Sequence, residues 1–91
     1  MNSKHSLILS SHALEDLQYW TRENPRIAQK ILKLIEETVK TPFAGIGKPE
    51  PLKHLKVNTW SRRIDNEHRL VYEVLENEIR IVQCRYHYTK S

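Results

Sequence analysis

The period of the hydrophobic pattern changes at Pro42, and this change limits the folds open to the chain. Before Pro42, apolar residues recur every three to four positions, which is the spacing of one face of an α-helix. After the glycine-containing loop of residues 42–49, short apolar runs rich in β-branched and aromatic residues alternate with polar turns, a pattern typical of antiparallel strands. At 91 residues the chain has room for one domain with a small core. We therefore predict a single domain, residues 1–91, of the α+β class, with two antiparallel helices packed on a mainly antiparallel β-sheet.

The expected elements follow the order β-α-α-β-β-β-β. Two helices are predicted at about residues 11–23 and 25–40, because Ser10 or Ser11 can cap the first and Asn24 with Pro25 can begin the second. Asn58 suits a left-handed turn between two of the strands. The last strand is rich in isoleucine and valine, so we expect it inside the sheet. The predicted strands are residues 7–9, 52–55, 60–64, 69–75 and 79–88.

Charge and composition exclude several classes of function. Lys and Arg total 15 against 11 Asp and Glu, and this net charge of +4 is compatible with a nucleic acid or an acidic protein as partner. No apolar run approaches the roughly 20 residues of a membrane span. Residues 7–9 are too short for a signal-peptide core, so we expect a cytoplasmic protein without a membrane partner. The single cysteine, Cys84, cannot form an internal disulfide, and its place in a strand pattern favours packing over reactivity.

A carboxylate, a cation and an imidazole stand out as candidate chemical groups. Glu50 lies between Pro49 and Pro51, which stiffen the backbone that presents its carboxylate. Together with Arg69 and His87 it provides the parts needed to cleave RNA without a metal. A base takes the proton of the ribose 2′-OH, an acid protonates the departing 5′-oxygen, and a cation stabilises the charge that develops on phosphorus. We predict no cofactor and no metal, since the histidines lack metal-ligand spacing.

Basic residues around these groups form a candidate RNA-binding surface. Aromatic rings on which bases can stack are interleaved with them, namely those of Trp60, Tyr72, Tyr86 and Tyr88. Neighbours on a strand point to opposite faces, so Arg62 and Arg63 cannot both share the face of Arg69. Each residue also has an ordinary structural explanation. Glu50 can be a surface glutamate, the arginines can pair with nearby carboxylates, and His87 can merely finish the sheet. The candidate RNA-binding residues are Lys48, Lys53, Arg62, Arg63 and Arg85.

Four sequence motifs carry a specific resemblance. They are GKPEPLK at residues 47–53, WSRRI at 60–64, EHRLVY at 67–72 and CRYHY at 84–88. In this order they closely resemble the YoeB toxins of the YoeB–YefM toxin–antitoxin systems, a family of the RelE/ParE superfamily. The resemblance covers nearly the whole chain. It implies the RelE/ParE-like microbial RNase fold and a ribosome-dependent mRNA endonuclease that cleaves translated mRNA in the A site and so inhibits translation.

The resemblance also implies partners. A YefM-like antitoxin would neutralise the toxin, and we expect an acidic, largely disordered antitoxin segment that folds along the toxin over the tip at His87 and Tyr88. The complex of the two proteins, rather than the toxin alone, would bind operator DNA and regulate its own transcription. The mRNA and the ribosome would be the other partners, and the toxin would form a homodimer.

Site residues are carried over position by position. The resemblance implies that Glu50 is the general base and that Arg69 stabilises the transition state. It implies that His87 is the general acid and that Tyr88 positions the substrate by stacking or hydrogen bonding. Lys53 matches a lysine near the scissile phosphate. The family usually ends at the tyrosine, whereas three residues follow Tyr88 here.

Two other functions remain open at this point. A toxin of the same superfamily that inhibits gyrase without catalysis, as ParE toxins do, would share the fold. Such a gyrase binder has no need of the set Glu50, Arg69, His87 and Tyr88. A plain nucleic-acid-binding module or repressor would also use a basic surface. Ribosome-dependent cleavage of mRNA distinguishes the enzyme from both.

Overall fold

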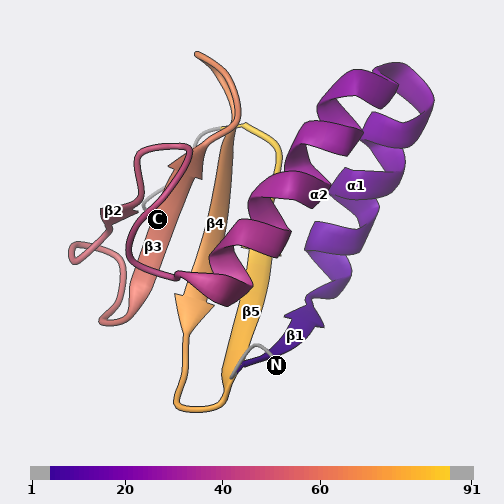
Figure 1. Cartoon of the computed structure of the whole chain (residues 1–91). Coiled ribbons are helices and arrows are strands. Elements are labelled where there is room, and N and C mark those ends of the chain that lie inside the picture. The colour runs from indigo at the N-terminus through magenta and orange to yellow at the C-terminus, as the bar shows by residue number, and fades with distance from the viewer. Residues whose placement is uncertain (1–4, 87–91) are drawn as a thin grey trace.

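The computed structural model describes residues 5–86. Within them, the sheet contains five strands in the order β1-β5-β4-β3-β2, and β1 runs parallel to β5 while the other neighbours are antiparallel. Figure 1 shows both helices on one face of this sheet. The predicted α+β class, with two helices on a mainly antiparallel sheet, is confirmed. The elements are β1 (Ser6–Leu9), α1 (Ser11–Glu23), α2 (Pro25–Lys40), β2 (Glu50–Pro51), β3 (Thr59–Arg63), β4 (Arg69–Val74) and β5 (Glu78–Gln83).

Both helices begin where local capping signals stand in the sequence. The Ser10 hydroxyl accepts the N–H of Ala13 at 3.0 Å and so caps α1. Pro25 lies in the first turn of α2, where a missing N–H leaves no hydrogen bond unmade. Asn24 caps α2 only through its backbone carbonyl, which accepts the N–H groups of Ile27 and Ala28. The predicted helix ranges are confirmed. No helix within residues 5–86 is long and apolar enough to cross a membrane.

The core lies between the helices and the sheet. Burying one large aliphatic side chain contributes about 1.5–3 kcal/mol, so this layer supplies most of the stability. On the opposite face of the sheet, Thr59, Ser61 and Val71 are also buried. The core residues are Ala13, Trp20, Ala28, Ile31, Leu34, Ile35, Ile64, Leu70, Tyr72, Ile79, Ile81 and Cys84.

The strand predicted at residues 52–55 is wrong, because this segment is a turn. The N–H of Leu52 donates to the carbonyl of Thr59, and its own carbonyl accepts the N–H groups of Leu55 and Lys56. These backbone groups are therefore hydrogen-bonded to one another within residues 52–59 and cannot pair with a neighbouring strand. Pairing with β3 is confined to Glu50–Pro51, just before the turn. The left-handed turn predicted at Asn58 is confirmed by its φ of 73°.

The last strand is interior, as predicted, but it ends at Gln83 rather than at residue 88. Tyr72 pairs with Ile81 while the preceding Val71 pairs with Gln83, so Val82 is an extra residue in β5 and forms a β-bulge. Beyond Gln83 the chain leaves the sheet, and Tyr86 takes a left-handed φ of 65°. The remainder of the predicted strand, residues 87 and 88, lies outside the described residues.

Candidate active site

The sheet face opposite the helices carries Glu50. In β4, Leu70 and Tyr72 belong to the core, so the intervening Val71 points to the other face. Val71 pairs with Ser61 of β3, and Ser61 pairs with Glu50 of β2. Since directly paired residues share a face, Glu50 lies on the sheet face opposite the helices. Its neighbours Ser61 and Val71 are buried on this face, whereas Glu50 itself is exposed. Its flanking prolines fit the edge position of β2, where an N–H is not needed on the outer side.

Arg69 lies on the same face as Glu50. It stands two residues from Val71 along β4 and pairs directly with Arg63. Its guanidinium Nη1 donates to the backbone carbonyls of Asp65 at 2.7 Å and His68 at 3.1 Å. No ion pair of Arg69 is found within residues 5–86. The carbonyls orient the guanidinium but do not neutralise it, so its positive charge is available to an anionic ligand.

The other basic residues predicted on this surface lie in different settings. Arg85 is half-buried, and its guanidinium carbon lies over the ring of Tyr19 at 3.5 Å and the ring of Tyr86 at 4.5 Å from their centroids. Cation–π stacking on both sides holds this side chain close to α1. The predicted RNA-binding residues that are exposed are Lys48, Lys53 and Arg63.

The prediction that Arg62 contacts RNA is wrong. Arg62 has no exposed surface, because the alternation of β3 turns it toward the helices. Its guanidinium donates to the carbonyls of Thr41, Ala44 and Ile46, and its Nε donates to the Tyr72 hydroxyl. Arg62 therefore fastens the loop that follows α2 to the sheet.

Tyr72 and Trp60, also expected among exposed rings, point to the helix side. Tyr72 is fully buried and donates its hydroxyl proton to the carbonyl of Pro42 at 2.6 Å. Burial raises the pKa of Tyr72, although its hydrogen bond from Arg62 acts in the opposite direction. Trp60 pairs with Tyr72, and its ring contacts Phe43 at 4.9 Å between centroids. The exposed ring of the described part of this surface is that of Tyr86.

A basic pocket of about 580 Å³ lies between α2 and the β3–β4 hairpin. Its wall includes the buried side chains of Leu34 and Ile64, and lysines from α2 and from the loop before β2 add positive charge. The pocket thus combines an apolar floor with cations, a combination that suits an acidic ligand with an apolar part. The lining residues are Lys30, Lys33, Leu34, Ile46, Gly47, Lys48, Arg63, Ile64, Asp65 and Asn66.

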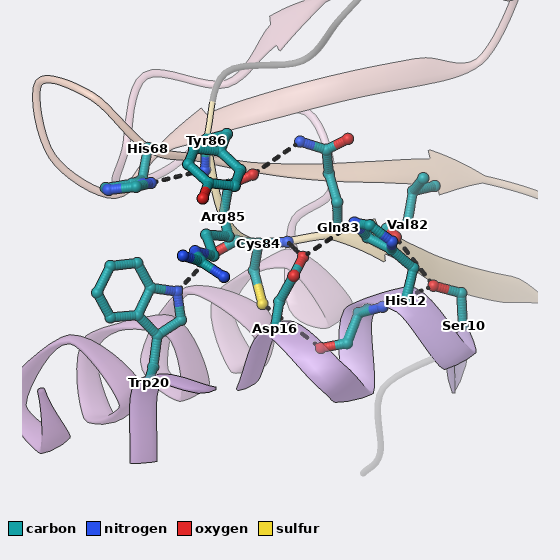
Figure 2. A network of polar contacts seen from close by, with 11 residues as sticks. Ser10, His12, Asp16, Trp20, His68, Val82, Gln83, Cys84, Arg85 and Tyr86 are labelled. Carbon is teal, nitrogen blue, oxygen red and sulfur yellow. Dashed lines mark hydrogen bonds and ion pairs between the residues drawn. The ribbon is translucent and has the colours of Figure 1, made fainter. Parts of the chain in front are cut away.

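The segment after β5 is tied to α1 by hydrogen bonds, which Figure 2 shows. The N–H of Cys84 donates to the Asp16 carboxylate at 3.0 Å, and the carbonyl of Cys84 accepts the indole N–H of Trp20 at 2.9 Å. Ser10 donates to the carbonyl of Val82 in the bulge. Both backbone groups of Cys84 and the carbonyl of Val82 thus find side-chain partners. This attachment fixes where the chain leaves the sheet on its way to His87 and Tyr88, which lie outside the described residues.

Cys84 is part of this attachment and not a reactive group. Its side chain is 1% exposed, and its thiol points at the carbonyl of Ala13 at 3.7 Å. Burial, together with the nearby Asp16 carboxylate, raises the pKa of the Cys84 thiol to about 12. The prediction that packing outweighs reactivity at this cysteine is confirmed.

Sequence reasoning missed Asp16 and His68. Asp16 is buried, and a signal for it existed, because it follows Ala13 by three positions on the apolar face of α1. In the sequence, His68 is one of the histidines without metal-ligand spacing, and no other signal assigns it a role. It is 9% exposed, and its Nδ1 accepts the N–H of Tyr86 at 2.6 Å. The hydrophobic periodicity of a sequence does not indicate contacts between a turn and a residue that follows the last strand. The contact between His68 and Tyr86 could therefore be found only in the structure.

Comparisons with known proteins cover almost the whole chain. The sequence profile of the family described as "YoeB-like toxin of bacterial type II toxin-antitoxin system" matches residues 9–88. Toxin YoeB from Escherichia coli (strain K12) is 52% identical over 82 residues, which is 90% of this chain and 98% of that protein.

Solved structures agree with these sequence matches. A YoeB/ParE toxin from Agrobacterium tumefaciens is 44% identical, with a TM-score of 0.87, over 91% of this chain and 99% of that one. A chain in the heterotetrameric YoeB–YefM toxin–antitoxin complex from Staphylococcus aureus is 41% identical, with a TM-score of 0.80, over 92% and 98% of the two chains. The fold, the four motifs and these likenesses lead to one conclusion: the chain belongs to the YoeB-like toxins of bacterial type II toxin–antitoxin systems.

Proposed function

We propose that this toxin is a metal-independent endoribonuclease that cleaves mRNA in the ribosomal A site and thereby inhibits translation. The observation that supports the proposal is the sheet face opposite the helices. There Glu50, a carboxylate held between two prolines, and Arg69, a guanidinium with no ion pair within residues 5–86, share one side of three paired strands. The backbone N–H of Arg69 also donates to the carbonyl of Tyr86, the residue before His87, at 3.0 Å.

In the proposed reaction, the Glu50 carboxylate removes the proton of the ribose 2′-OH, and the 2′-oxygen attacks the adjacent phosphorus. The bond from phosphorus to the 5′-oxygen breaks, and His87 gives that oxygen a proton. The products are a 2′,3′-cyclic phosphate and a free 5′-OH. Arg69 stabilises the negative charge on the phosphoryl oxygens, and Tyr88 positions the substrate.

Exposed basic residues would hold the RNA backbone. Lys48, Lys53 and Arg63 are the members of the predicted set that solvent reaches, and Arg85 is half-buried. Contacts of lysine and arginine with phosphate release counterions, so binding should weaken steeply as salt rises. Arg62 is left out of this surface because it is fully buried.

Partners follow from the family. We propose that a YefM-like antitoxin inhibits this chain, that the toxin forms a homodimer when free, and that the toxin–antitoxin complex binds operator DNA. The heterotetrameric complex of the relative from Staphylococcus aureus supports the first of these proposals.

The decisive experiment measures single-turnover cleavage of an mRNA on ribosomes whose A site holds the target codon. We expect cleavage only with ribosomes present, and none when the nucleotide before the cleaved bond lacks its 2′-OH. Cleavage that survives removal of the 2′-OH would exclude the proposed mechanism. Ribosome binding without any cleavage would favour a binding module, and inhibition of gyrase would favour a ParE-like toxin.

A modified substrate separates the proposed roles. Loss of a proton-transfer group costs about 10²–10⁴-fold in rate, and loss of a charge-stabilising donor costs about 10²–10³-fold. A sulfur in place of the bridging 5′-oxygen leaves without a proton. It should therefore rescue His87→Ala far more than Glu50→Ala or Arg69→Ala. Equal rescue of all three variants, or none for His87→Ala, would show that His87 is not the general acid.

A further inference from the structure

The imidazole of His68 makes an unusual contact with the backbone. Its Nδ1 accepts the N–H of Tyr86, with 2.6 Å between the two nitrogens. An imidazole nitrogen accepts a hydrogen bond only while it carries no proton, so this contact requires a neutral ring with its hydrogen on Nε2. The Glu67 carboxylate lies 3.7 Å from Nε2, the nitrogen that carries this hydrogen.

Neighbouring groups hold the ring in place. The indole of Trp20 meets it edge to face, with 4.9 Å between centroids, and the ring of Tyr86 lies 5.7 Å away. The backbone N–H of His68 donates to the Asp65 carboxylate at 2.7 Å. Figure 2 shows the ring beside Tyr86, at the point where the chain has left β5. Because these contacts fix the position of the imidazole, its Nδ1 can in turn fix the position of the Tyr86 N–H.

Tyr86, whose N–H the imidazole binds, has a backbone conformation that requires stabilising contacts. Tyr86 has a φ of 65°, a left-handed conformation that a bulky side chain rarely adopts. Its N–H is bound by His68, and its carbonyl accepts the N–H of Arg69 at 3.0 Å. His68, just before β4, and Arg69, the first residue of β4, thus bind both backbone polar groups of Tyr86. Without them, nothing in the sheet ladder would keep this residue left-handed.

We propose that His68 is a positioning residue for the proposed reaction. Its neutral imidazole fixes the turn at Tyr86, and with it the direction in which the chain continues into His87 and Tyr88. In this proposal His68 does not itself transfer protons to the substrate. The consequence for cleavage rests on the proposed function, whereas the turn at Tyr86 exists independently of it.

Three substitutions distinguish positioning from packing. In His68→Asn, the side-chain oxygen can take the place of Nδ1 as acceptor. His68→Leu fills a similar volume without an acceptor, and His68→Gln places its amide nearer the position of Nε2. A misplacement of about 1 Å costs on the order of 10²-fold in rate. We therefore expect His68→Leu and His68→Gln to lose about that factor in the single-turnover rate, with ribosome affinity unchanged, and His68→Asn to recover most of it.

A spectroscopic measurement tests the contact without reference to activity. In ¹⁵N-labelled toxin, the Nδ1 of His68 should show the chemical shift of an unprotonated nitrogen and a scalar coupling to the Tyr86 amide nitrogen through the hydrogen bond. In His68→Leu the coupling must vanish and the Tyr86 amide must exchange faster with solvent. If the coupling is present but the wild type cleaves no mRNA, the proposed function fails and the turn remains. If the coupling is absent, or if His68→Leu and His68→Asn cleave at the same rate, the positioning role is refuted.

Discussion

Arg62 and Arg69 show how one type of side chain serves two purposes in a single sheet. Arg62 is wholly buried and donates to three loop carbonyls and to Tyr72. Arg69 is half-buried and donates to two carbonyls on the face opposite the helices. We therefore expect the same substitution to act mainly on stability at Arg62 and mainly on cleavage at Arg69.

We expect Arg62→Ala to lower the free energy of unfolding by about 3 kcal/mol or more, because several buried acceptors lose their donor. Arg69→Ala should leave that free energy nearly unchanged and should slow cleavage on the order of 10²–10³-fold. Urea denaturation and single-turnover cleavage of both variants provide the test. An Arg62→Ala variant as stable as the wild type would contradict the structural role assigned to Arg62.

Cys84 should be inert toward alkylation in the folded protein. Its pKa is raised to about 12, so almost no thiolate exists at pH 8, and thiolate is the reactive form. The raised pKa also means that Cys84 contributes stability at low and neutral pH, which is lost as the pH rises from 9.0 toward about 12. Mass spectrometry after iodoacetamide treatment should show modification only in denaturant. Equal labelling of native and denatured protein would disprove this protection.

At the scale of elements, helices were predicted better than strand ends. The limits of α1 and α2 depend on neighbours in sequence, such as Ser10 and Pro25, so the sequence contains their signals. The end of β5 depends on a bulge at Val82 and on the distant Asp16, which binds the N–H of Cys84. Glu50 and Arg69 could be named from the motifs, but their shared face follows from strand pairing, and the burial of Arg62 contradicts its motif-based role.

The attachment of β5 to α1 gives a prediction about Asp16. We expect Asp16→Leu to lower the free energy of unfolding by about 1–3 kcal/mol, because the buried N–H of Cys84 is left without an acceptor. Asp16→Asn keeps an acceptor and should cost less. Glu15→Leu, on the exposed side of the same helix, is the matched control and should change little. Hydrogen exchange at the Cys84 amide should accelerate in Asp16→Leu alone, and an unchanged rate there would show that the carboxylate does not hold this end of β5.

At the scale of the whole molecule, both helices lie on one face of the sheet, as Figure 1 shows. The net charge of +4 favours acidic partners. The basic pocket beside α2 extends this charge beyond the sheet face, through Lys30 and Lys33. An acidic antitoxin segment that also contains apolar side chains would match the pocket in both charge and polarity.

We expect the double variant Lys30→Glu with Lys33→Glu to weaken antitoxin binding on the order of tenfold at low salt, with a smaller difference at high salt. The matched control is Arg22→Glu with Arg26→Glu, which makes the same charge change on exposed residues outside the pocket. Titration calorimetry at two ionic strengths measures both variants. Equal losses in the two double variants would mean that net charge, and not the pocket, attracts the antitoxin.

The position of β5 also sets the order in which a nascent chain can fold. β5 lies between β1 and β4, so Leu7 near the start of the chain finds its partner only in Ile79. Contacts between such distant segments close late, because the loop between them must be ordered first. Until β5 has been synthesised, β1 has no neighbouring strand. The hydrogen bonds that tie the segment after β5 to α1 also cannot form before then. A toxin whose synthesis has stopped before β5 therefore lacks both the strand that joins β1 to β4 and the turn at Tyr86 that His68 and Arg69 bind.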